Sequence, residues 1–246
     1  MRDPMHFDAD AAGYESARPP YPDALWACLH ELGALRPGLR ALDLGAGSGQ
    51  ATGPLLEAGL TVTAVEPGVH LAARLSERFP EAVVLVSRAE DAVLPTGSFD
   101  VVVAATSIHW MDLAVVLPKV RAALVDRGLL LVWANEYGDP SVPRTPFRER
   151  VETIVRARAP LPPDDRQALD PPRWAETFTR GGHFRVVRQE LFRWAIDLDA
   201  AQVRALFATF SNWTADEANE AADAVCSLGG TVHEHYTTPL IALEAV

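Results

Sequence analysis

The sequence predicts an α/β fold in which a mostly parallel sheet is covered by helices on both faces. Short runs rich in β-branched residues alternate with longer amphipathic stretches between residues 40 and 135. Strands that alternate with helices of this length imply βαβ units, right-handed crossovers and a parallel sheet. The runs VVVAA at 101–105 and LLLVWA at 129–134 are apolar throughout, as strands covered on both faces require.

The strands and helices between residues 22 and 134 follow one another in a regular order. A helix is expected at 22–35, after a segment rich in Pro and Tyr. Short apolar runs predict strands at 40–44, 61–66, 82–86, 99–105 and 129–134, and amphipathic stretches predict helices at 50–58, 69–78 and 114–124.

The pattern changes after residue 135. Residues 139–172 are rich in Pro and Arg and contain one expected helix, at 147–158. A long strand at 184–194, helices at 200–210 and 215–228 and a closing strand at 235–243 follow. The stretches inserted between these strands are expected to form a small helical cap over the carboxyl edge of the sheet.

Composition and charge argue against several classes of protein. The 246 residues hold 22 basic and 33 acidic side chains, a net charge of −11, which argues against a protein that binds nucleic acid. No apolar run reaches the roughly 18–20 residues that span a bilayer, and no secretory signal opens the chain. The two cysteines form neither a disulfide framework nor a metal-binding spacing, so we expect a reduced, cytoplasmic protein.

A glycine-rich turn gives the first sign of chemistry. The sequence LDLGAGSG at 42–49 follows the first strand and opens a helix. Glycines there allow a tight turn and a close approach of the backbone to a ligand. Sheets of this kind bind ligands at the carboxyl ends of their strands. A dinucleotide fold requires a third glycine at position 50, where Gln50 stands, and no lysine follows as in a Walker loop.

Further signals stand at the ends of the next strands. Glu66 ends the second strand, 21 residues beyond Gly45, where a carboxylate can accept hydrogen bonds from both hydroxyls of a ribose. The sequence SRAED at 87–91 follows the third strand, where an acidic side chain can accept from an adenine amino group. The sequence IHW at 108–110 follows the fourth. Signals at successive strand ends indicate a nucleotide-type cofactor.

With these motifs the chain resembles the class I S-adenosylmethionine-dependent methyltransferases, in particular the branch with trans-aconitate methyltransferases and many bacterial small-molecule methyltransferases. The resemblance is carried by YESARPPYP at 14–22, LDLGAGSG at 42–49, VEP at 65–67, AED at 89–91, SFDVVVA at 98–104, HW at 109–110 and RGLLLVW at 127–133. It covers residues 6–138 well and continues more weakly through LFRW at 191–194, TFSNW at 209–213 and YTTPLIAL at 236–243.

The resemblance implies a Rossmann-like sheet of seven strands, mostly parallel, with the last strand antiparallel between the fifth and sixth. It divides the chain into an N-terminal lid and helix at 1–39 and a cofactor-binding core at 40–138. A cap insertion at 139–183 follows. The C-terminal strands at 184–246 complete the sheet and carry a helical insertion at 199–230.

The resemblance also implies S-adenosylmethionine as the cofactor, a small-molecule acceptor and a set of cofactor-binding residues. The methionine part would be lined by Asp43, Gly45, Ala46, Gly47 and Gly49. Glu66 would hold the ribose, Pro67 would pack near the adenine, and Ala89 and Glu90 would flank it. Thr106 would present its backbone to the amino acid end, and Tyr14 and Arg18 would close over the cofactor.

The acceptor side has fewer signals. Methyl transfer from a sulfonium is an in-line displacement with a neutral leaving group, so alignment supplies much of the catalysis, about 7–11 kcal/mol. A base helps only where the acceptor begins protonated. His109 is the candidate, because its pKa lies near the operating pH; it alternatively orients the acceptor or lines its pocket. Trp110 and Tyr21 are expected beside the acceptor.

Several interpretations stay open at this point. The arginines at 144, 148, 150, 156 and 158 form a solvated helix face, or some of them receive an anionic acceptor. His233 and His235 share one face of a strand, but no third metal ligand is evident, so no metal is expected. Alternative functions are a non-methylating reaction such as cyclisation on the same fold, a non-catalytic cofactor-binding partner, and a nicotinamide dehydrogenase, which Gln50 disfavours.

Overall fold

The computed structural model describes residue 8 and residues 17–158, 173–210 and 212–246. Contacts within the chain divide it into two compact units. We call Pro20–Asn135, Gln167–Phe192 and Thr238–Val246 the sheet unit, and Met1–Pro19, Glu136–Arg166 and Arg193–Thr237 the helical unit. The two long C-terminal strands each have residues in both units.

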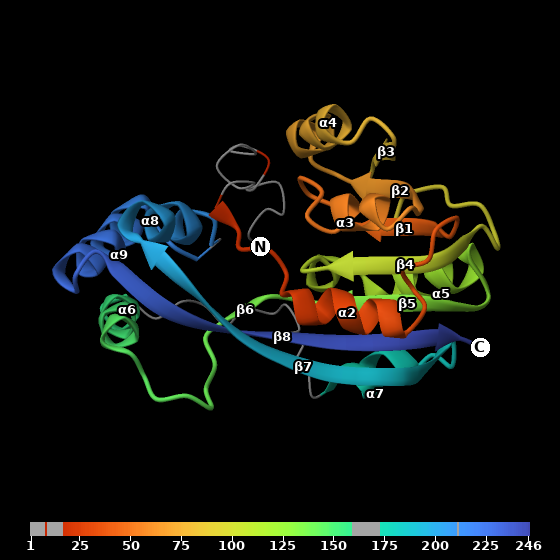
Figure 1. The fold of residues 1–246 in the computed structure, drawn as a ribbon. Helices are drawn as coiled ribbons and strands as arrows, with labels where there is room; N and C mark the ends of the chain where they lie inside the picture. The colour runs from red at the N-terminus through yellow and green to blue at the C-terminus, as the bar shows by residue number, and fades with distance from the viewer. Residues whose placement is uncertain (1–7, 9–16, 159–172, 211) are drawn as a thin grey trace. The chain divides into compact units, whose positions relative to one another are not determined.

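The sheet unit contains the parallel sheet that the sequence predicts (Figure 1). Its strands run in the order β3-β2-β1-β4-β5-β8. The pairs from β3 to β5 are all parallel, whereas β8 is antiparallel to β5, with Ala242 opposite Leu131. The strands are β1 (Arg40–Leu44), β2 (Thr61–Glu66), β3 (Val83–Val86), β4 (Phe99–Ala105), β5 (Leu124–Trp133) and β8 (Thr231–Ala245). The mostly parallel sheet and its antiparallel last strand are confirmed.

The full sheet has eight strands, so the expectation of seven was wrong by one. The additional strand, β6 (Glu136–Tyr137), has only two residues, and Tyr137 pairs with Tyr236 of β8. A strand this short has no alternation that a sequence pattern could reveal. The strand β7 (Phe184–Asp199) pairs with β8 and extends beyond residue 194, because its exposed and half-buried residues alternate to the end.

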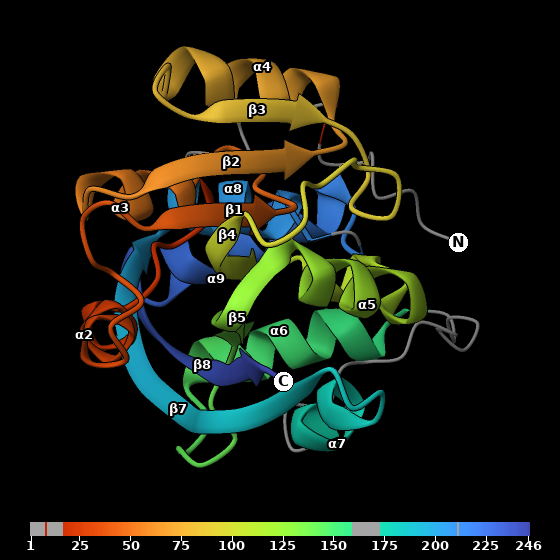
Figure 2. The ribbon, with the colours of Figure 1, turned by 90° about the vertical axis from the view of Figure 1, so that its right-hand side faces the viewer.

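Helices cover both faces of the sheet (Figure 2). Successive residues of β4 point to opposite sides: Val102 packs in a cluster with Val120 of α5, and Val103 in a cluster with Leu25 of α2. The helices of this unit are α2 (Asp23–Glu31), α3 (Thr52–Glu57), α4 (Val69–Arg78), α5 (Leu113–Ala123) and α7 (Trp174–Thr179), with a short 3₁₀ helix, η2 (Ile108–Trp110). This double cover explains why the central strands are apolar throughout.

Helix α7 has no counterpart among the helices that the sequence predicts. It has six residues, too few for a periodic pattern, and is stabilised by tertiary contacts. Trp174 and Phe178, four residues apart, are both buried and pack edge to face with ring centroids 6.2 Å apart. Burial of this pair against the sheet holds the helix in place.

The helical unit has a core of its own. It contains α6 (Pro146–Arg156), α8 (Ala200–Ala208) and α9 (Ala215–Ser227). Capping boxes begin the last two helices, since Asp199 and Thr214 each exchange hydrogen bonds with the residue three positions later. Within the described ranges, no helix is long and apolar enough to cross a membrane.

Candidate cofactor site

Four loops meet at one edge of the sheet unit. The strands β3, β2, β1 and β4 are adjacent and parallel, so the segments that follow them lie at the same carboxyl edge. These segments are 87–92, 66–68, 45–49 and 106–110, in that order. They contain most of the residues that the sequence assigned to the cofactor.

The turn at 45–49 has a shape that only glycine tolerates at two positions. Gly45 has a φ of +68°, and a Cβ there would lie 2.6 Å from the Cβ of Ser107. Gly49 has a φ of +93°, and its Cβ would lie 2.5 Å from the ring of Phe79. The backbone N–H groups of Gly45 and Ala46 donate to the carbonyl of Val65, at 2.8 and 3.2 Å. The turn is therefore tied closely to β2.

Glu66 lies buried at the end of β2 and holds the glycine turn. Its Oε2 accepts a hydrogen bond of 2.8 Å from the backbone N–H of Gly47, and its Oε1 one of 2.8 Å from Gly68. A carboxylate has about four acceptor sites, and these two bonds use one site on each oxygen. Position and chemistry both fit the expected role of Glu66. Pro67, the next residue, is half-buried.

Asp43 is fully buried at the end of β1. Its Oδ2 accepts from the hydroxyl of Thr52 at 2.7 Å, whereas its Oδ1 has no hydrogen-bond partner among the described residues. Burial raises the pKa of Asp43 to about 7; the Thr52 hydroxyl opposes the rise and the charge of Glu66 adds to it. A buried carboxylate oxygen without a donor fits a site for the ammonium group of an amino acid.

The segment after β4 is strained and packed against β1. Thr106 has a φ of +56°, uncommon for a β-branched residue, and its N–H donates to the carbonyl of Trp133 at 2.8 Å. Its hydroxyl lies 3.0 Å from the hydroxyl of Tyr21. Ser107 donates to the carbonyl of Leu44 at 2.5 Å. Backbone strain of this kind clusters at functional sites, which fits the predicted role of Thr106.

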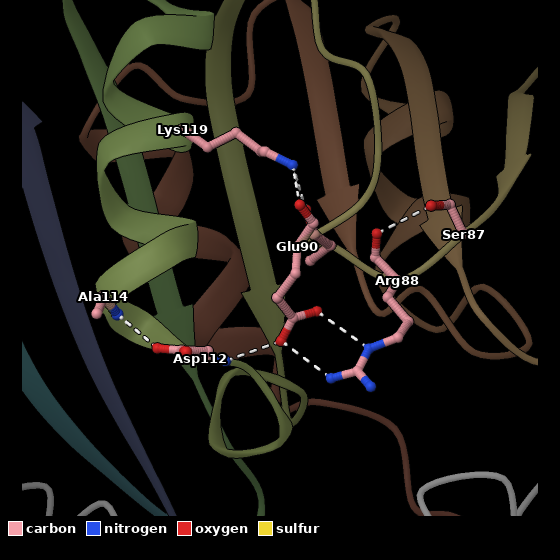
Figure 3. Close-up of polar contacts among 7 residues, drawn as sticks. Ser87, Arg88, Glu90, Asp112, Ala114 and Lys119 are labelled. Carbon is pink, nitrogen blue, oxygen red and sulfur yellow. Dashed lines mark hydrogen bonds and ion pairs between the residues drawn. The ribbon is translucent and has the colours of Figure 1, made fainter.

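The loop after β3 is tied to helix α5 rather than to the glycine turn (Figure 3). Glu90 accepts from the backbone N–H of Asp112 at 2.8 Å and pairs with Arg88 at 3.4 Å. Partial burial raises the pKa of Glu90, but the Asp112 N–H and the Arg88 guanidinium outweigh it, so the pKa lies below its usual value. Ala89 is buried, and its backbone N–H has no acceptor within the described part of the chain. The N–H of Ala89 is therefore one donor that this loop offers to a base.

The residues expected at the acceptor differ in exposure. His109 is exposed in η2, and its ring centroid lies 5.1 Å from that of the half-buried Trp110. Tyr21 is buried against Trp133 with the rings edge to face. Tyr21 is as buried as Glu66, whereas His109 is exposed.

Of the two N-terminal residues assigned to the cofactor, the structure describes Arg18. Tyr14 is outside the described residues. Arg18 belongs to the helical unit, where its Nη2 donates to the carbonyl of Thr209 at 3.1 Å and its guanidinium lies 5.1 Å from the centre of the Phe210 ring. Their closing over the cofactor stays a prediction.

One of the predicted arginines stands apart within the helical unit. Arg148 pairs with the fully buried Glu234, Nε to Oε2, at 2.9 Å, and its guanidinium lies 3.3 Å from the centre of the Tyr137 ring. Its Nη2 has no hydrogen-bond partner in the ranges described. Arg148 and Glu234 line a cavity of about 520 Å³. The others differ: Arg144 and Arg156 pair with Glu152, Arg158 pairs with Glu217, and Arg150 is exposed.

Three residues that contact the candidate cofactor-binding residues were not predicted from the sequence. Thr52 donates to one oxygen of Asp43, Ser107 leaves no room for a side chain at Gly45, and Lys119 donates to carbonyls of the loop after β3. The first two bear no motif. Lys119 had a signal, since it is the single lysine of the chain. No group of three His, Cys, Asp or Glu residues suited to a metal occurs among the described residues.

Comparisons with known proteins agree with this geometry. Residues 42–132 match the methyltransferase domain family. An uncharacterized methyltransferase of Mycobacterium tuberculosis is 38% identical over 130 residues, which are 52% of this chain and 52% of the relative. The chain thus spans about half the length of the curated relatives it matches. The segment from β1 to β5 is thus similar to methyltransferase domains.

Solved structures share the fold over most of the chain. A candidate type II methyltransferase from Anaeromyxobacter dehalogenans is 25% identical, with a TM-score of 0.65, over 92% of this chain and 97% of that one. Phosphoethanolamine N-methyltransferase 2 of Haemonchus contortus, in complex with S-adenosylhomocysteine, is 17% identical with a TM-score of 0.59, over 98% and 58%. The [4+2]-cyclase SpnF is 17% identical with a TM-score of 0.59, over 97% and 93%. The last two show the fold alone.

Proposed function

We propose that this protein transfers the methyl group of S-adenosylmethionine to a small-molecule acceptor, and that it belongs to the branch resembling trans-aconitate methyltransferases. The observation that carries the proposal is the glycine turn at 45–49, fixed by the carboxylate of Glu66 at the carboxyl edge of the sheet. The match of residues 42–132 to methyltransferase domains supports it.

The cofactor-binding residues each have a chemical role in this proposal. The turn at 45–49 lets the backbone approach the methionine part, and the free oxygen of Asp43 receives its ammonium group. Glu66 accepts from the ribose, and the N–H of Ala89 donates to the adenine. When bound, S-adenosylmethionine would supply an electrophilic methyl group on its sulfonium. Loss of that methyl group leaves a neutral thioether. The chain then has to align the acceptor and exclude water.

The acceptor in this proposal is a small molecule such as a carboxylic acid or a secondary metabolite. His109 takes a proton from an acceptor that begins protonated, or orients one that does not. We further propose that the protein acts in the cytoplasm.

Calorimetry with S-adenosylhomocysteine, without added metal, tests the cofactor assignment. Glu66→Gln keeps one acceptor oxygen and should weaken binding by about 1.5–3 kcal/mol, the value of hydrogen bonds to a charged group. Glu77→Gln, on the exposed side of α4, is the matched control and should leave affinity unchanged. No binding by the natural chain, or equal affinity in the Glu66 variant, contradicts the proposal.

Transfer of a labelled methyl group to a panel of small acids and alcohols tests the reaction. The [4+2]-cyclase with this fold gives the alternative, a non-methylating reaction, a specific basis. A chain that binds S-adenosylmethionine, leaves the label on it and still converts a substrate would favour that alternative.

A further inference from the structure

The single lysine of the chain is bonded to the loop after β3. The Nζ of Lys119, on helix α5, donates to the backbone carbonyls of Ala89 at 3.2 Å, Ala92 at 3.0 Å and Glu90. An ammonium group has three N–H donors, and here each has a carbonyl acceptor. Every donor of this side chain therefore serves one four-residue stretch of backbone.

The same loop is held at two further points. The carboxylate of Glu90 accepts from the N–H of Asp112, the residue that caps the start of α5. Within the loop, the N–H groups of Asp91 and Ala92 both donate to the carbonyl of Arg88, at 3.1 and 2.9 Å. Figure 3 shows Lys119 and Asp112 reaching Glu90 from the same helix. The backbone from 88 to 92 is thus fixed from the side of α5.

Fixing the carbonyls determines which backbone groups the loop can offer to a ligand. The carbonyls of Ala89, Glu90 and Ala92 are occupied by Lys119, whereas the N–H of Ala89 has no acceptor in the described ranges. An adenine presents an acceptor, N1, beside its amino group, so it complements the N–H of Ala89. Hypoxanthine carries a proton on N1 and does not.

We propose that Lys119 is a positioning residue that sets the base specificity of the cofactor site by holding the loop at 88–92. The proposal rests on the proposed function, in which this loop receives the adenine. A compact ammonium suits the task, because its three donors converge on three carbonyls, which the planar fork of an arginine cannot do. Lys119 is the single lysine of the sequence, so no other lysine can replace it in binding these carbonyls.

The test measures base discrimination by calorimetry in four chains. The ligands are S-adenosylhomocysteine and S-inosylhomocysteine, in which an oxygen replaces the amino group and N1 carries a proton. The variants are Lys119→Met and Lys119→Arg. The matched control is Arg121→Met, on the same helix, where the arginine contacts the carbonyl of Val246 rather than the loop. Thermal unfolding without ligand confirms that each variant is folded.

The natural chain and the Arg121 control should prefer S-adenosylhomocysteine. Lys119→Met should lose about tenfold in affinity for S-adenosylhomocysteine and little for S-inosylhomocysteine, since one ordered hydrogen bond to the base is worth about 1–1.5 kcal/mol. Lys119→Arg should lose part of the preference for S-adenosylhomocysteine over S-inosylhomocysteine. If Lys119→Met does not fold, Lys119→Arg alone tests the inference. An unchanged ratio of affinities, even with both weakened, overturns the inference. Failure of the natural chain to bind S-adenosylhomocysteine overturns the proposed function itself.

Discussion

Asp43→Asn should change how stability depends on pH. Asparagine has nearly the same shape and can still accept from Thr52, but it cannot ionise. In the natural chain burial raises the pKa of Asp43 from 3.8 to about 7, so the folded state keeps a proton that the unfolded state releases. The free energy of unfolding should therefore fall as the pH rises from about 4 to about 7, and level off above that. The asparagine variant should lack this fall.

The size of the effect follows from the pKa difference. The rise spans about 3 pH units, and each unit corresponds to about 1.36 kcal/mol, so ionising Asp43 costs the fold up to about 4 kcal/mol. No allowance for solvent is needed, because the side chain is fully buried. Binding a ligand with an ammonium group should recover part of this cost, and S-adenosylhomocysteine should then bind more tightly as the pH rises through 7.

Urea unfolding of the ligand-free chain between pH 5 and 8.5, followed by tryptophan fluorescence, measures the effect. Asp126→Asn is the matched control, because the Asp126 side chain is 99% exposed. The difference in unfolding free energy between the natural chain and Asp43→Asn should change by about 2.7 kcal/mol across this range, from about 2 pH units at about 1.36 kcal/mol each, whereas the control difference should stay flat. A difference for Asp43→Asn that does not vary with pH would refute the reasoning.

Three further predictions concern the turn, the acceptor side and the helical unit. Gly45→Ala should cost about 1–3 kcal/mol of stability in urea melts, since its Cβ meets Ser107 at a positive φ; Ser107→Gly in the same chain should restore part of it. His109→Gln should remove the acidic limb of the pH–rate profile and lower turnover by about 10²–10⁴-fold; an unchanged profile excludes a base. Glu234→Gln should cost about 1.5–3 kcal/mol of stability, because the half-buried Arg148 loses its charged partner. Glu152→Gln, at an exposed pair, should cost at most about 1 kcal/mol.

The sequence predicts the sheet well because its strands end at residues with distinct chemistry. The bounds of β1, β2 and β4 agree with the expectation to the residue, since glycines, a glutamate and charged residues mark their ends. The same distinct chemistry makes Glu66 and Asp43 candidates for the site, and their roles stay predictions. Strand β6 and helix α7 depend on partners distant in the sequence, and their own residues carry no period that a pattern could detect.

The supporting contacts of the site were beyond prediction for a related reason. Lys119 follows the loop it holds by about thirty residues, and its role depends on how α5 packs beside β4 and β5. Ser107 opposes Gly45 only because two loops meet at one edge. Ligand binding restricts which residue types can occupy a position, so it leaves a motif in the sequence. Many different side chains can make a supporting contact, so such contacts leave no motif.

The hydrogen bond between Gly47 and Glu66 has a consequence for the kinetics of binding. The glycine turn has its shape in the chain by itself, so little backbone entropy remains to be lost when a ligand arrives. Association should then need no slow rearrangement of this turn, and differences in affinity among cofactor analogues should lie in their dissociation rates. Stopped-flow traces with a single, concentration-dependent phase would be the signature of this preorganisation.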